Sequence, residues 1–137
     1  MIEVTERELV PQEIVDRLKK DKYGAVVTFL GIVRDFDDGR RLVFLEYEAF
    51  KDMAEGKLSE IAETIRERWH LDDVALCHRT GRLQVGDISL VAAVAAPHRK
   101  EAFEACQYAV ETLKEIVPIW KKEVWEGGSA WVEGERA

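Results

Sequence analysis

The sequence has only two cysteines, Cys77 and Cys106, which stand far apart and belong to no CxxC or Cys/His pattern. A zinc site or a thioredoxin-like redox centre therefore has little support, and buried structural thiols are the expected alternative, although a reactive cysteine is left open. No uninterrupted apolar run approaches the length that crosses a membrane, and the amino terminus lacks the basic and apolar regions of a signal peptide. We therefore expect a cytoplasmic protein.

Basic residues are also in the minority, with 20 Lys and Arg against 27 Asp and Glu and a net charge of −7. Nucleic acid and anionic membranes demand a basic surface, so neither is expected as the main partner, although a local basic pocket is compatible with this balance. The chain also lacks a P-loop, a nucleophile elbow, an HExxH pattern and a Rossmann glycine fingerprint. Nucleoside triphosphatase, hydrolase and dehydrogenase functions thus lose their usual sequence support.

What the chain does have is a regular alternation of apolar segments and turns over 137 residues, enough for one domain with a hydrophobic core. Apolar periodicity predicts a short helix from Val10 with Pro11 in its first turn, a long helix containing Ala54 to Trp69, and a last helix that opens near His98 and ends before Pro118. Strands are expected at Gly24–Gly31, Leu45–Ala49, Val74–Thr80, Ile88–Ala96 and around Trp131. The Asp-Gly turn between the first two predicts that they form a hairpin. Strands alternating with helices, joined partly by tight turns, favour an α+β fold.

Two lysines, Lys114 and Lys121, flank the predicted end of the last helix. Helical spacing puts Lys114 at the edge of the apolar stripe of that helix, which Pro118 cannot continue. The residues after Pro118 should leave as a strand or loop, in which Lys121 shares a side with Glu123. Ammonium groups beside apolar surface suit an anionic ligand or proton transfer. Two surface lysines with solvated amino groups are the simpler interpretation of this pattern taken alone.

Two further segments present cations where a strand ends. Pro97-His98-Arg99-Lys100 opens the last helix, and unpaired amides with cationic side chains at a helix start favour phosphate or carboxylate. A solvated helix start, with His98 as a capping or packing residue, is the alternative. Arg34 follows an apolar strand, and its planar guanidinium suits a bidentate contact with the same anions. It could equally pair with the acidic residues of the next turn.

Taken together, five segments resemble the catalytic large subunit of molybdopterin synthase. They are, in chain order, Gly24–Arg34, Leu45–Ala49, Pro97–Arg99, Leu113–Lys114 and Pro118–Glu123. The resemblance extends from about Gly24 to Trp131, and the last segment is much more specific than its individual lysines.

This resemblance implies a sulfurtransferase of molybdenum-cofactor biosynthesis that converts cyclic pyranopterin monophosphate (precursor Z) to molybdopterin. In that family the sulfur arrives as a thiocarboxylate on the carboxyl-terminal Gly-Gly tail of a small ubiquitin-like subunit, and the large subunits form a central homodimer within a heterotetramer. The implied fold is an α/β-hammerhead-like domain with an additional antiparallel β subdomain, here one domain over residues 1–137. No metal or other cofactor is implied for this subunit, because molybdenum would be inserted after this step.

Carried over position by position, the resemblance implies catalytic roles for Lys114, the first choice near the incoming thiocarboxylate, and for Lys121. The implied substrate-binding residues are Ile32, Val33, Arg34, His98, Arg99, Lys114, Lys121, Lys122 and Glu123. These positions are distant in sequence, so folding or dimerisation must gather them into one pocket. A non-catalytic module that binds a phosphorylated small molecule or a ubiquitin-like tail is the alternative, and a structural dimer with incidental basic residues is a third possibility. Formation of product separates the enzyme from both.

Overall fold

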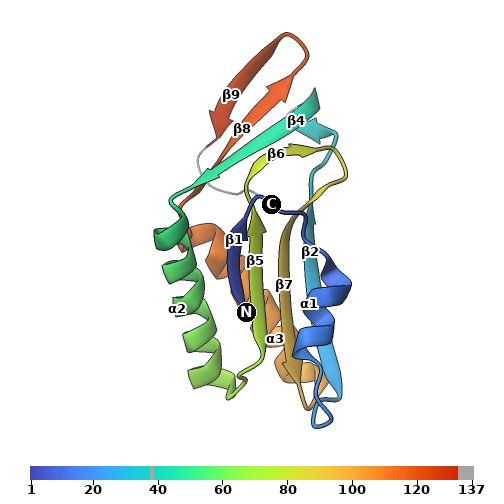
Figure 1. Ribbon diagram of the computed structural model, residues 1–137, viewed down its shortest axis with the longest axis vertical. Helices are drawn as coiled ribbons and strands as arrows, with labels where there is room; N and C mark the ends of the chain where they lie inside the picture. Colours follow the sequence, from blue (N-terminus) through green and yellow to red (C-terminus); the bar gives the residue numbers. More distant parts are fainter. Residues whose placement is uncertain (38, 133–137) are drawn as a thin grey trace.

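A four-stranded sheet forms the lower part of the computed structural model, which describes residues 1–37 and 39–132 (Figure 1). The strands lie in the order β1 (Ile2–Thr5), β5 (Val74–Arg79), β7 (Ile88–Ala96) and β2 (Ala25–Ile32). β1 and β5 are parallel, and the other neighbours are antiparallel. Helices α2 (Lys51–Trp69) and α3 (Arg99–Ile116) cover one face, and α1 (Pro11–Leu18) packs on the other.

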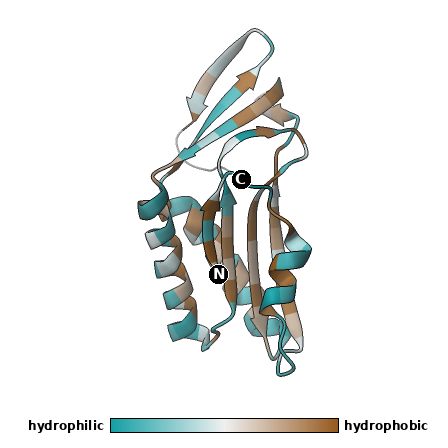
Figure 2. Cartoon of the chain, viewed as in Figure 1, coloured by the Kyte–Doolittle hydropathy of each residue, from teal (hydrophilic) through white to brown (hydrophobic). Residues whose placement is uncertain are grey.

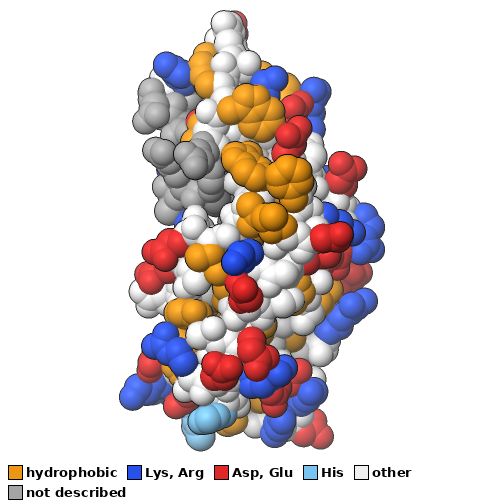
Figure 3. Space-filling view, turned by 90° about the vertical axis from the view of Figure 1, so that its left-hand side faces the viewer, with side chains coloured by type: hydrophobic (Ala, Val, Ile, Leu, Met, Phe, Trp, Pro, Cys, Tyr) orange, Lys and Arg blue, Asp and Glu red, His pale blue; other side chains and the backbone are white. Residues whose placement is uncertain are grey.

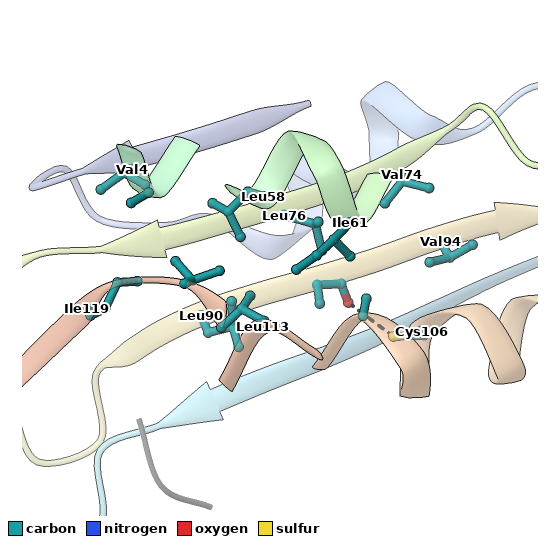
Figure 4. Close-up of a cluster of buried hydrophobic side chains, with 14 of the residues drawn as sticks. Val4, Leu58, Ile61, Val74, Leu76, Leu90, Val94, Cys106, Leu113 and Ile119 are labelled. Atoms are coloured by element: carbon teal, nitrogen blue, oxygen red, sulfur yellow. Dashed lines mark hydrogen bonds between the residues drawn. The ribbon is translucent and has the colours of Figure 1, made fainter. Parts of the chain in front are cut away.

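The central strands are apolar because helices cover both faces of the sheet, as the brown strands of Figure 2 show. Along β7, Leu90 and Val94 face the α2 and α3 side, whereas Val91 and Ala93 face α1. Figure 4 shows the larger core between the sheet and the two long helices. Its fully buried side chains include Leu58, Ile61, Leu76, Leu90, Val94 and Leu113. Helices α2 and α3 therefore have fixed positions on the sheet.

A second, antiparallel sheet stands above the first (Figure 1). Its strands lie in the order β3 (Phe36–Asp37), β4 (Arg40–Ala49), β8 (Ile119–Trp125) and β9 (Gly128–Val132). A further strand, β6 (Gly81–Gln84), pairs with β4 on the side opposite β8. Its long strand β4 pairs Tyr47 with Lys121 and Leu45 with Glu123. The α+β class expected from the sequence, including the additional antiparallel β part, is confirmed.

The predicted hairpin between Gly24–Gly31 and Leu45–Ala49 is wrong. β2 pairs with β7, and β4 turns back instead on the short β3. The chain leaves the lower sheet at Val33, whose N–H donates to the Asp87 carbonyl (3.0 Å) and whose carbonyl accepts from the Gly86 N–H (2.8 Å). This long-range attachment redirects the chain before it reaches the predicted Asp37-Asp38-Gly39 turn, in which Asp38 lies outside the described residues.

The last helix begins and ends where the sequence predicts. His98 is its extended N-cap, and Val117 is its C-cap directly before Pro118. The segment before His98 passes close to Gly24, directly before β2. A Cβ at Gly24 would come within 2.5 Å of the Pro97 carbonyl oxygen, so this position requires a glycine. Among the described residues, no helix is both long and apolar enough to span a membrane.

Candidate functional site

Lys114 lies in the last turn of α3 and is directed toward β2. Its Nζ is 5.9 Å from the centroid of the Phe29 ring, within the range in which the face of an aromatic ring attracts a cation. The same lysine lines a hollow of about 330 Å³ formed by the chain from Lys114 to Trp120, where α3 ends and β8 begins. Lys114 is thus half-buried between apolar surface and an open hollow.

Lys121 and Glu123 lie on the inward side of β8, as the alternation with Ile119 predicts. Each is only 7% exposed. Lys121 stands opposite the buried Tyr47 of β4, and Glu123 opposite the buried Leu45. Within residues 1–37 and 39–132 no ion pair of the Lys121 ammonium is found. A buried ammonium without an ion pair costs free energy unless a ligand or hydrogen bonds compensate it, so Lys121 is suited to an anionic ligand.

Lys122 points to the opposite side of β8 from Lys121, because successive side chains of a strand alternate. Its Nζ lies 5.9 Å from the ring centroid of Trp131 on β9. The substrate contact predicted for Lys122 would therefore have to come from the other face of this sheet.

The segment Ile32–Arg34 lies at the same end of the lower sheet as Lys114. Register pairs Ile32 with Ile88 at the start of β7, while α3 runs back along the sheet to end near this point. The side chains of Ile32 and Arg34 are exposed, whereas Val33 is part of the core. Arg34 can reach a ligand at this end of the sheet, and the side chain of Val33 has a packing role.

His98 and Arg99 lie at the other end of the lower sheet. They follow Ala96, which pairs with Ala25 at the start of β2. Arg99 opens α3 and Lys114 lies fifteen residues later in the same helix, so about 22 Å of helix axis separates them. Both His98 and Arg99 are exposed. Folding of one chain therefore brings Lys114, Lys121 and Arg34 to one end and leaves His98 and Arg99 at the opposite end.

An exposed apolar patch that the sequence analysis did not identify adjoins the Lys114 hollow. Phe50, the N-cap of α2, is 66% exposed, and its ring meets that of Trp120 edge-on with centroids 5.6 Å apart. Met53 in the first turn of α2 is also exposed. Figure 3 shows hydrophobic side chains gathered in the upper half of the α2 side, above a lower half in which acidic and basic groups mix. The sequence did contain a sign of this patch, because Phe50 and Met53 fall outside the apolar stripe that predicts the buried side of α2.

The two cysteines are buried, as expected. Burial raises the pKa of the Cys77 thiol, and likewise that of Cys106, to about 11, so neither is a thiolate at neutral pH. In the described part of the chain no group of three or more His, Cys, Asp and Glu residues could hold a metal ion.

The chain is similar to known proteins over almost its whole length. A family model described as "MoaE protein" matches residues 4–116. A protein of Halalkalibacterium halodurans named "Molybdopterin synthase catalytic subunit" is 47% identical over 129 residues, which cover 94% of this chain and 83% of that protein. A Bacillus subtilis protein of the same name is 45% identical over 130 residues, with 95% and 83% covered. The X-ray crystal structure of molybdopterin synthase from Staphylococcus aureus matches with a TM-score of 0.92 and 44% identity over 96% of each chain. These matches confirm the resemblance seen in the sequence.

Proposed function

The chain belongs to the MoaE family and is an enzyme of molybdopterin synthesis, and from this premise we propose how its residues serve the reaction. The substrate in this proposal is precursor Z, and the sulfur donor is the thiocarboxylate at the tail of a small ubiquitin-like subunit. The proposal keeps the single domain over residues 1–137 and the cytoplasmic location expected from the sequence.

Lys114 acts at the point where the donor tail meets the substrate. The observation that carries this role is its position, half-buried beside Phe29 and open to the hollow between α3 and β8. The thiocarboxylate sulfur bonds to a carbon of the pterin side chain as the C–O bond at that carbon breaks, and the oxygen leaving group takes up a proton. Water then attacks the acyl carbon and cleaves the acyl C–S bond, so that the sulfur stays on the pterin and the tail leaves as a carboxylate. The Lys114 ammonium stabilises the anion that develops in each step and can donate a proton to the leaving group.

Lys121 and Glu123 form the inner wall of the same site. Lys121 presents a buried positive charge, and an anionic substrate would offset the free energy that its burial costs. Arg34, at the same end of the lower sheet, supplies a guanidinium for the pterin phosphate. Ile32 and Lys122 remain predicted contacts at the margin of the site.

The exposed Phe50 and the half-buried Trp120 that its ring contacts are suited to receive the body of the small subunit. They lie beside the hollow that contains Lys114, so a domain bound there could direct its flexible tail at the lysine. Exposed aromatic side chains are typical anchors of protein interfaces.

His98 and Arg99 complete the site only if a second copy supplies them, because about 22 Å of helix axis separates Arg99 from Lys114 in one chain. A homodimer at the centre of a heterotetramer provides such a second copy. In this assembly each site has Lys114, Lys121 and Arg34 from one copy and a phosphate-binding helix start from the other.

The direct test mixes the purified chain with a thiocarboxylated small subunit and precursor Z and follows dithiolene formation by mass spectrometry. Lys114→Ala should lower turnover about a hundredfold or more, as for other groups that stabilise a developing anion, with little change in thermal unfolding. Lys57→Ala, which removes a partly exposed lysine of α2, is the matched control and should keep parental turnover. Parental turnover in Lys114→Ala would reject the catalytic role, and absence of product from the parent chain would reject the function.

A further inference from the structure

His78 is a buried histidine that the proposed mechanism does not use. It lies near the end of β5 and stands between Val4 of β1 and Leu90 of β7, both of which belong to the core under α2 and α3. Its Nδ1 is 2.7 Å from the Arg79 carbonyl oxygen. Because a carbonyl can only accept, Nδ1 carries the hydrogen, and this bond limits the rotation of the ring. The top of the core therefore contains a polar ring in a fixed orientation.

The His78 ring contacts a residue of the upper sheet. Its centroid lies 5.1 Å from that of the Tyr47 ring on β4, with an angle of 68° between the ring planes, an edge-to-face geometry that favours contact between aromatic rings. The turn between β5 and β6 makes this contact possible. Gly81 begins β6 shortly after His78, has a φ of +86° that favours glycine, and pairs with Tyr47. One short segment thus brings the two rings together.

Tyr47 lies beside Lys121 on the inward face of the upper sheet. The two residues stand opposite each other in the antiparallel pair of β4 and β8, so their side chains point to the same side, with Cβ atoms about 4.5–5.5 Å apart. Both side chains are buried, with 4% and 7% exposed. On the β6 side, the residue opposite Tyr47 is Gly81, which has no side chain. The Tyr47 ring is therefore placed to pack between His78 and the aliphatic stem of Lys121.

This row of side chains joins the two parts of the site. Lys114 belongs to the lower part, since the adjacent Leu113 lies in the same core as Leu90, whereas Lys121 belongs to the upper sheet. A lysine stem has several rotatable bonds, so an unsupported ammonium would occupy many positions. A contact that runs from His78 on the lower sheet to Lys121 on the upper sheet limits how far the two ammonium groups lie from each other.

We propose that His78 and Tyr47 are positioning residues for Lys121. His78 holds the Tyr47 ring against the lysine stem, and this fixes the Lys121 ammonium relative to Lys114. Neither ring touches the substrate in this proposal, so both act through Lys121. The effect on turnover rests on the proposed function, whereas the position of the ammonium does not depend on the reaction.

The first measurement follows the Lys121 ammonium without substrate, in a nuclear magnetic resonance spectrum of isotope-labelled lysine side chains. The Lys121 signal is the one that Lys121→Ala lacks. His78→Asn keeps a donor near the place of Nδ1 but removes the ring, and Tyr47→Leu removes the ring at the other end of the contact. Each should shift or broaden the Lys121 signal. Val74→Ala is the matched control, because Val74 is buried on the same strand and the same side as His78, and it should leave the signal in place. Circular dichroism shows which variants fold.

The second measurement is kcat in the two-subunit assay with precursor Z. A displacement of about 1 Å at a reacting group can cost about a hundredfold, so His78→Asn should lower kcat about ten- to hundredfold. In the Lys121→Ala background the same substitution should change kcat less than about twofold, because a residue that acts through Lys121 has no further effect once the lysine is removed. A merely structural role would lower kcat by the same factor in both backgrounds, and Val74→Ala would lower it as well.

An unshifted Lys121 signal in either folded ring variant would overturn the positioning role. An equal loss of kcat with and without Lys121 would also overturn it. Absence of product from the parent chain, together with a Lys121 signal that His78→Asn displaces, would instead reject the proposed function and leave the positioning of Lys121 in place. The two failures are therefore distinguishable.

Discussion

Mixing two inactive variants tests whether the site is shared between copies. Arg99→Ala removes a charged hydrogen-bond donor from the proposed phosphate site, an effect of about 1.5–3 kcal/mol, or roughly a ten- to hundredfold loss of turnover. Lys114→Ala should lose about a hundredfold or more. In the homodimer of either variant both sites lack one group, because both copies carry the same substitution.

A mixed dimer behaves differently. One of its two sites combines the intact Lys114 of the first chain with the intact Arg99 of the second, and the other site lacks both. Mixed dimers purified through two different tags should therefore show about half of the parental turnover per dimer. Unsorted random mixtures should show about a quarter, because about half of the dimers are mixed. The assay is again dithiolene formation from precursor Z and the thiocarboxylated small subunit.

The control pairs two residues that lie at the same end of one chain. Mixed dimers of Lys114→Ala and Lys121→Ala have one defective lysine in every site, so their turnover should stay at the level of the single variants. Recovery in this control, or no recovery in the mixture of Arg99→Ala and Lys114→Ala, would refute the division of the site between copies.

Three further predictions concern the body of the protein. Cys77 and Cys106 should resist iodoacetamide near neutral pH until urea unfolds the chain, because burial raises the pKa of each thiol to about 11. Mass spectrometry of the chain labelled with and without urea measures this, and rapid labelling of the folded chain would contradict it. Burial alone would raise the pKa of Asp73, but the hydrogen bond from the Tyr23 hydroxyl and the ion pair with Lys20 lower this pKa below its ordinary value of 3.8. The ionised Asp73 therefore stabilises the folded state above that pH, and this stabilisation is lost in stronger acid. Asp73→Asn should therefore cost about 1 kcal/mol of unfolding free energy at neutral pH and almost nothing in strong acid, as urea titrations at both pH values would show. Ile61→Ala in the core should cost about 2–5 kcal/mol, and a loss well under 1 kcal/mol in urea unfolding would show that the site is not tightly packed.

Local patterns predicted the helices well. The stripe of α2 and the limits of α3 follow from apolar periodicity and from Pro118, which act within a few residues of the chain. The buried side of β8 followed from alternation, which correctly grouped Ile119, Lys121 and Glu123. The partner of β2 was predicted wrongly, and β1 and β6 were not predicted. Strand pairing depends on residues far apart in the chain, so a nearby Asp-Gly turn is a weak guide to it.

The sequence by itself determined the family and the helix that carries both Arg99 and Lys114. The sequence left open whether folding or dimerisation gathers them, and in the structure about 22 Å of helix axis separates the two residues. Only the tertiary structure decided that β2 pairs with β7 and stands last in the order of the lower sheet. The position of β2 depends on strand register and helix packing, which together decide which apolar surfaces are buried. These contacts join residues far apart in the chain, so no local sequence pattern predicts them.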